Sequence, residues 1–135
     1  MSIRIRYAVT GAGSSTTAEE KDLGNSKWEI VSDGLTKGGT WVTTLAAGAT
    51  DVQLQIDNLS SINLLVIRSM ANDPNDTPVG ITVKRNNAGG EAIPIAPLSG
   101  TEEGHLVLST TGLTALYASN PGTIVMKLTI FAAGT

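Results

Sequence analysis

The chain has 135 residues, of which 41% are hydrophobic, and nine Lys and Arg against twelve Asp and Glu give it a formal net charge of −3. This length corresponds to one domain. The acidic balance offers no basic surface for nucleic acid, and no apolar run approaches the ~20 residues of a membrane-spanning helix. One histidine and no cysteine leave little material for acid–base, thiol or zinc chemistry. We therefore expect a soluble protein with no catalytic residues, no cofactor, no metal, and no nucleic-acid or membrane partner.

The residue composition predicts an all-β protein. Val, Ile and Thr together make up 37 of the 135 residues, and these side chains favour the pleated, half-buried surface of a sheet. Fifteen glycines and five prolines punctuate the chain and supply its turns.

Alternating or continuous apolar runs predict about ten short strands in chain order. The predicted strands are Ile3–Val9, Trp28–Val31, Thr40–Leu45, Asp51–Ile56, Asn63–Ser69, Val79–Val83, Glu91–Ile95, His105–Ser109, Leu113–Ser119 and Thr123–Phe131. Asn63–Ser69 contains a continuous apolar run, and Thr123–Phe131 has apolar residues in both of its alternating sets, which is typical of strands covered on both faces. For the last strand, we expect another subunit to provide the second cover.

Residues 10–26 interrupt this pattern. They are small and polar, and Leu23 is their one large apolar residue. Such a segment buries too little apolar surface to offset the ~1–2 kcal/mol of backbone entropy that each ordered residue costs. We predict a flexible polar arm that becomes ordered on binding a partner.

Strands spaced by 8–12 residues indicate a sandwich or a barrel. We expect a single domain, residues 1–135, built as a two-sheet antiparallel sandwich of jelly-roll type. An immunoglobulin-like sandwich is the nearest competitor, because the sequence alone does not give the strand order.

Three segments carry residues that could form a chemical site. Gly11–Ser15 has two of the three glycines of a dinucleotide fingerprint, and no apolar helix follows it, so it is interpreted as part of the arm. Asn72–Asp76 has oxygen ligands for calcium but lacks the glycine and distal glutamate of an EF-hand loop, and turn chemistry explains it. Glu102, Glu103 and His105 are the one place where a base and carboxylates cluster, and they are interpreted as a solvated loop.

The candidate interface residues are Arg4, Arg6, Leu23, Trp28 and Trp41. Aromatic residues are scarce in this chain, and the two tryptophans either pack across the sandwich, anchor an interface or stack on a sugar. Arg4 and Arg6 alternate with the apolar residues of the first strand, and they are either solvated or paired with carboxylates of a neighbouring subunit.

From Leu45 to Gly134, the order of motifs resembles that of the head decoration (cement) proteins of tailed bacteriophages. The motifs are TLAAGATDVQLQIDNLSSINLLVIRS, PVGITV, AIPIAPL and GHLVLSTTGLTALYASNPGTIVMKLTIFAAG. They are structural motifs, and residues 10–44 are not covered by them.

The resemblance implies a jelly-roll or related sandwich and a homotrimer that sits on the capsid exterior of the virion, after synthesis in the host cytoplasm. Its partner would be the major capsid protein, and its role would be to stabilise the shell without catalysis. Two alternatives remain: a carbohydrate- or receptor-binding module of a head fibre or tail, and a small hydrolase. The hydrolase would require a pocket that joins His105 to a carboxylate and a nucleophile.

Overall fold

A computed structural model describes residues 3–14, 22–35, 37–56, 59–97 and 103–135, and for residues 3–34 the backbone alone. Every helix or strand assigned in this part of the chain is a β-strand. The chain divides into two compact units, Met1–Leu35 and Thr36–Thr135. The sequence pattern did not predict a boundary at this point, because no change in composition marks it.

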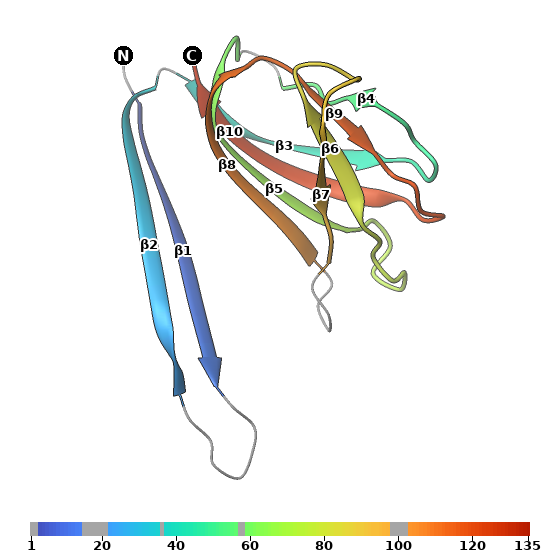
Figure 1. The fold of residues 1–135 in the computed structure, drawn as a ribbon, viewed down its shortest axis with the longest axis horizontal. Coiled ribbons are helices and arrows are strands. Elements are labelled where there is room, and N and C mark those ends of the chain that lie inside the picture. Colours follow the sequence, from blue (N-terminus) through green and yellow to red (C-terminus); the bar gives the residue numbers. More distant parts are fainter. Residues whose placement is uncertain (1–2, 15–21, 36, 57–58, 98–102) are drawn as a thin grey trace. The chain divides into compact units, whose positions relative to one another are not determined.

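The second unit is a sandwich of two four-stranded sheets (Figure 1). The first sheet has the order β3 (Lys37–Leu45), β10 (Met126–Gly134), β5 (Ile62–Ala71) and β8 (Glu103–Leu113). The second has the order β4 (Val52–Gln53), β9 (Leu116–Ser119), β6 (Ile81–Arg85) and β7 (Ala92–Ile95).

The strand pairing is that of a jelly roll. β6 pairs with β7, β5 with β8, β4 with β9, and β3 with β10, all antiparallel. The pairs are nested, as they would be in one long hairpin, and pairings of β10 with β5 and of β9 with β6 roll this hairpin into two sheets. The expected all-β, jelly-roll-like sandwich is therefore confirmed, and the strand order differs from that of an immunoglobulin domain.

The core lies between the two sheets because alternate residues of each strand point inward. In β10, for example, Met126, Leu128 and Ile130 are buried, whereas Lys127 and Thr129 between them are half-buried. The inward residues of both sheets form one hydrophobic cluster.

Several strand limits differ from the sequence-based expectation, among them those of β8 and β4. The strand predicted at His105–Ser109 extends further at both ends, because Glu103, expected in a loop, and Thr110–Gly112, which lay between two predicted strands, also belong to β8. The ten-residue β5 lies alongside and pairs with β8 from Glu103 to Leu113, and backbone hydrogen bonds of this kind form whatever the side chains. Conversely, only Val52 and Gln53 of the strand predicted at Asp51–Ile56 are paired as a strand.

The first unit is a hairpin of β1 (Ile3–Ser14) and β2 (Asp22–Leu35). Both strands are longer than the apolar alternation predicted, because pairing continues through the small residues Gly11 and Ala12. Residues 15–21, in the middle of the arm predicted at residues 10–26, lie outside the described residues.

A buried asparagine joins two turns at one end of the sandwich. Asn120 is fully buried, and its Nδ2 donates to the carbonyl oxygens of Leu45 at 3.2 Å and Ile124 at 2.8 Å. Its Oδ1 accepts a hydrogen bond from the backbone N–H of Gly122 at 3.0 Å. One of these hydrogen bonds ties the turn before β10 to the end of β3, and the other two hold the turn itself.

Candidate interaction surface

The sheet that contains β3, β10, β5 and β8 has an outer face, opposite to the core, whose residues follow from the strand register. Cα partners across the four strands form rows. Three consecutive outer rows are Thr44–Lys127–Met70–Glu103, Val42–Thr129–Arg68–His105 and Thr40–Phe131–Val66–Val107. This surface is called the outer face below.

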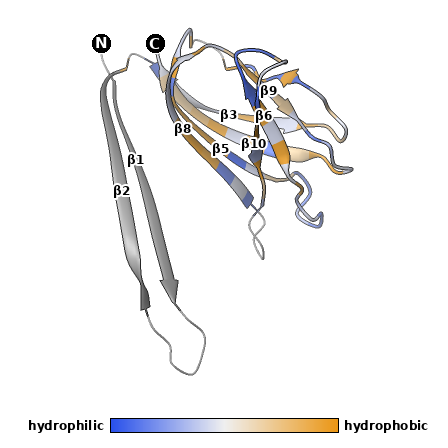
Figure 2. Cartoon of the chain, in the orientation of Figure 1, coloured by the Kyte–Doolittle hydropathy of each residue, from blue (hydrophilic) through white to orange (hydrophobic). Residues whose placement is uncertain are grey.

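Four hydrophobic residues of the outer face form what we call the apolar patch: Val42, Val66, Val107 and Phe131. Val42 is 64% exposed and Val107 is 39% exposed, and Val66 and Phe131 are half-buried. None of the four belongs to the hydrophobic cluster between the sheets. Figure 2 shows the apolar colouring of this sheet and the polar end of β8 that borders it. Contiguous exposed apolar residues of this kind mark interaction surfaces more often than single ones do.

A charged cluster lies beside the apolar patch. The Arg68 guanidinium contacts the Glu103 carboxylate, and His105 Nε2 lies 3.1 Å from Glu103 Oε2. The hydrogen bond from Arg68 lowers the pKa of Glu103 below its usual value, with a smaller contribution from His105, against the opposing effect of burial. The same bond raises the pKa of Arg68. The cluster therefore places an ion pair on the outer face, which also carries Lys127 in the same row as Glu103.

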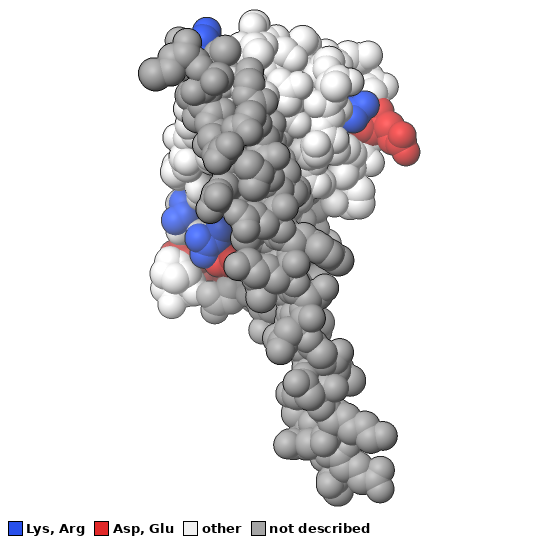
Figure 3. All heavy atoms as spheres, turned by 90° about the vertical axis from the view of Figure 1, so that its left-hand side faces the viewer, with Lys and Arg blue, Asp and Glu red and all other residues white. Residues whose placement is uncertain are grey.

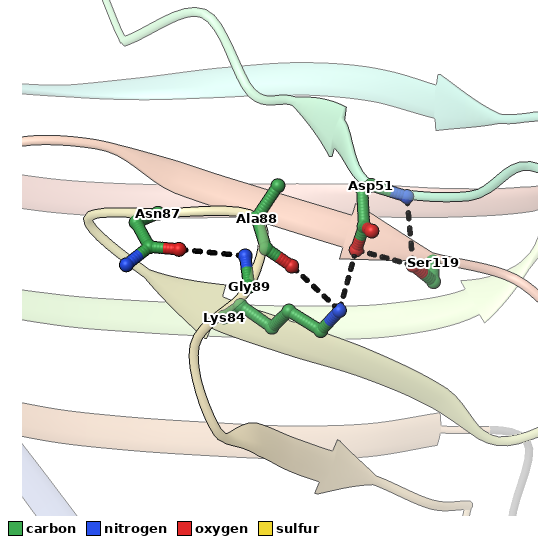
Figure 4. A network of polar contacts seen from close by, with 6 residues as sticks. All are labelled: Asp51, Lys84, Asn87, Ala88, Gly89 and Ser119. Carbon is green, nitrogen blue, oxygen red and sulfur yellow. Dashed lines mark hydrogen bonds and ion pairs between the residues drawn. The ribbon is translucent and has the colours of Figure 1, made fainter.

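The outer face of the second sheet is polar by contrast. Thr82, Lys84, Tyr117 and Ser119 alternate there with the buried residues of β6 and β9. Lys84 Nζ contacts Asp51 Oδ1 at 2.9 Å and donates to the Ala88 carbonyl at 2.8 Å (Figure 4). The Ser119 hydroxyl donates to Asp51 Oδ1 at 3.3 Å and accepts a hydrogen bond from the Asp51 backbone N–H.

This network satisfies its own polar groups, and the hydrogen bond from Lys84 lowers the pKa of Asp51. The two outer faces thus differ in kind: one is polar and internally bonded, and the other carries exposed hydrophobic side chains. In the view of Figure 3, most of the described surface of the protein is uncharged and the charged groups are few. The outer face of the first sheet is the better candidate for an interaction surface.

Among the described residues, no nucleophile is placed beside the one histidine. His105 is exposed on β8, and its described hydrogen-bond partner is Glu103. A hollow of about 240 Å³ lies at the end of β5 beside Lys127, and another of about 420 Å³ adjoins Arg85 and Glu91. Neither includes His105, so the pocket that the hydrolase alternative requires is not formed by either.

Metal ligands do not gather in the described part of the chain, where no group of three or more His, Cys, Asp or Glu is placed to hold an ion. The Asn72–Asp76 segment forms turns. Asp73 Oδ1 accepts hydrogen bonds from the backbone N–H and Nδ2 of Asn75 at 2.9 and 3.1 Å. The turn interpretation of this segment is therefore confirmed.

The predicted interface residues lie in different places. Trp41 on β3 is half-buried and packs against the core cluster, with its ring beside Gly39, as expected if it packs across the sandwich. Arg4 and Arg6 lie on β1, and Leu23 and Trp28 lie on β2. The side chains of these four residues are outside the described part.

The residues of the apolar patch were not among the interface residues expected from the sequence. The sequence nevertheless contained a signal for these residues. The strands predicted at Asn63–Ser69 and Thr123–Phe131 have apolar residues in both of their alternating sets of positions. These strands became β5 and β10, the two central strands of the first sheet. Val66 and Phe131 are the residues responsible, and both lie on the outer face.

No protein-family model matches this chain, and no curated protein sequence matches it. No helix in the described ranges is long and apolar enough to cross a membrane.

Proposed function

We propose that this protein is a non-enzymatic structural protein of a phage virion, which binds the exterior of the capsid and stabilises the shell. The observation that carries the proposal is the outer face of the first sheet, where Val42 and Val107 are exposed beside Val66 and Phe131. An exposed apolar sheet face fits a static protein–protein contact better than it fits catalysis.

The architecture supports the same proposal. Jelly rolls are common in viral capsid proteins and in lectins, although a fold alone does not specify a function. The resemblance of residues 45–134 to phage decoration proteins favours the capsid over a glycan. Trp41 adds to this preference, because it is half-buried and packs against the core cluster, as a structural tryptophan does.

The partners in this proposal are the major capsid protein and two further copies of the chain. A homotrimer multiplies each weak contact with the shell, because the second and third contacts are made at a high effective concentration. The arm predicted at residues 10–26, which includes Leu23, is the segment that we assign to the shell.

Sedimentation with assembled particles tests the proposal. Purified protein is mixed with particles of the major capsid protein of the same virus and separated on a density gradient. We expect it to travel with the particles at a constant ratio to the capsid protein and to saturate. A protein that stays at the top of the gradient, or that is displaced from the particles by a glycan, would contradict the capsid assignment.

A variant of the arm locates the contact with the shell. Residues 11–24 are replaced by a short glycine linker, and thermal melting is measured beside particle occupancy. We expect normal melting of the sandwich and reduced occupancy. Loss of folding would show that these residues belong to the core, and full occupancy with normal melting would place the contact on the sandwich.

A further inference from the structure

The outward side of the second sheet carries one aromatic side chain among polar groups. Strand register places Tyr117 of β9 between Gln53 of β4 and Lys84 of β6. Ser119 and Thr82 form the next row on the same side. We call the surface formed by these five residues the polar face. Because its side chains are borne by paired strands, their positions are fixed more closely than they would be on loops.

Tyr117 lies at the centre of the polar face and outside the core. It is half-buried between the buried residues Leu116 and Ala118 of β9. It belongs neither to the hydrophobic cluster between the sheets nor to the residues packed against that cluster, among which is Trp41. In the described part of the chain, the Tyr117 hydroxyl has no hydrogen-bond partner. Part of an aromatic ring with a polar tip is therefore available to a ligand.

Hydrogen-bonding groups surround this ring. Gln53 is exposed, and its side-chain amide and the Thr82 hydroxyl have no hydrogen-bond partner among the described residues. An amide offers two donors and an acceptor, and a hydroxyl offers one donor and two lone pairs. Beside them, Asp51 bonds to Lys84 and Ser119 through Oδ1, which leaves Oδ2 as an acceptor (Figure 4). Donors and acceptors thus border one aromatic ring.

The charges of Lys84 and Asp51 balance each other on this face. Lys84 Nζ contacts Asp51 Oδ1 at 2.9 Å and also donates to the Ala88 carbonyl. The hydrogen bond from Lys84 lowers the pKa of Asp51, so the carboxylate is ionised at neutral pH. A charged ligand would have to give up its hydration for a site whose charges are already paired, whereas a neutral ligand has no such cost. Charge therefore favours a neutral ligand.

We propose that the polar face binds a neutral pyranose ring of a glycan. The C–H face of a pyranose is apolar and stacks on an aromatic ring, and its hydroxyls lie at the rim as donors and acceptors. Tyr117 provides the stacking ring in this proposal. Gln53, Thr82 and Asp51 Oδ2 bond to the rim hydroxyls. Because the polar face belongs to the second sheet and the apolar patch to the first, glycan binding can fail or hold independently of capsid binding.

Titration by heteronuclear NMR tests the proposal. The probes are the methyl glycosides of glucose, galactose, mannose and N-acetylglucosamine, added in turn to isotope-labelled wild-type protein. At ordinary ligand efficiencies, a hexose of about twelve non-hydrogen atoms binds with a Kd of about 2 mM. We expect at least one glycoside to saturate the protein in this range. The amide shifts should be concentrated at residues 51–53, 82–84 and 117–119, which form the polar face and its support.

Substitutions separate stacking from hydrogen bonding. Tyr117→Phe removes only the hydroxyl and should raise the Kd of the bound glycoside by less than about fivefold. Tyr117→Leu keeps a large apolar side chain but no ring, and should raise the Kd by about tenfold or more. Gln53→Ala should also weaken binding, and because Gln53 is exposed, this variant should melt like the wild type. Asn75→Ala removes an exposed amide elsewhere on the sandwich and is the control with an unchanged Kd.

Three results would overturn the proposal. They are the absence of saturable shifts with every glycoside at about 50 mM, far above the expected Kd, shifts that map outside the second sheet, and equal Kd values for the wild type and a folded Tyr117→Leu. Glycoside binding by a protein that never sediments with particles would contradict only the proposed function. Sedimentation with particles by a protein that binds no glycoside would contradict only the sugar site.

Discussion

Replacing Asn120 by alanine should destabilise the sandwich more than the same change at the exposed Asn75. The substitution removes the Nδ2 bonds to the Leu45 and Ile124 carbonyls and the Oδ1 bond from the Gly122 N–H. A hydrogen bond contributes about 1 kcal/mol net to stability, so three of them amount to about 3 kcal/mol. The site is fully buried, and the backbone groups left behind lose partners that water replaces only in part.

The loss should be visible in thermal and chemical unfolding. For a chain of this length, about 3 kcal/mol corresponds to a fall in Tm of about 10 °C. Asn75→Ala is the matched control, because Asn75 is exposed and its side chain bonds only within its own loop, to Asp73. We expect the control to change stability by less than about 0.5 kcal/mol.

A second substitution separates hydrogen bonding from volume. Asn120→Asp keeps the shape and the acceptor for Gly122 but turns an oxygen toward the carbonyl oxygens of Leu45 and Ile124. A buried carboxylate without a cation is costly, so the loss at neutral pH should exceed that of Asn120→Ala and should shrink as the pH falls. If the free energy of unfolding of either variant lies within about 0.5 kcal/mol of the wild-type value, Asn120 does not fix this turn.

Two further predictions concern buried and charged groups of the first sheet. The buried Ser69 Oγ has no hydrogen-bond partner in the described structure. Ser69→Ala should therefore raise the free energy of unfolding by about 1 kcal/mol, measured by chemical unfolding. A decrease would show that the hydroxyl has a hydrogen-bond partner, such as a bound water. The folded pKa of Glu103 lies below its usual value of 4.5, so its contribution to stability is present above pH 4.5 and is lost as the pH falls through the folded pKa. Between pH 7 and pH 3, the free energy of unfolding of Glu103→Gln should therefore fall by less than that of the wild type. Glu91→Gln is the control for loss of an exposed carboxylate outside the ion pair. Equal falls in all three proteins would show that the ion pair contributes nothing to stability.

The sequence predicted most of the local structure because strand formation depends on short-range patterns. The strands at Thr40–Leu45, Asn63–Ser69 and Glu91–Ile95 all lie within or overlap observed strands, since alternating or continuous β-branched residues favour a pleated chain over a helix. The turn at Asn72–Asp76 followed from side chains that bond to their own backbone. Where side chains carried no pattern, as at Gly11–Ser14 and Thr110–Gly112, strands were missed because the partner strand supplies the backbone bonds.

Composition and patterning determined that this chain is an all-β sandwich, and the tertiary structure decided which surface is exposed. The sequence showed that the strands now called β5 and β10 are apolar on both faces, but a strand pattern does not say which neighbours cover each face. Pairing placed β10 between β3 and β5, and this brought Phe131 and Val66 into one row with Val107. Residues 65 positions apart become neighbours only through the nested pairing of distant strands, so the apolar patch is a property of the folded sheet.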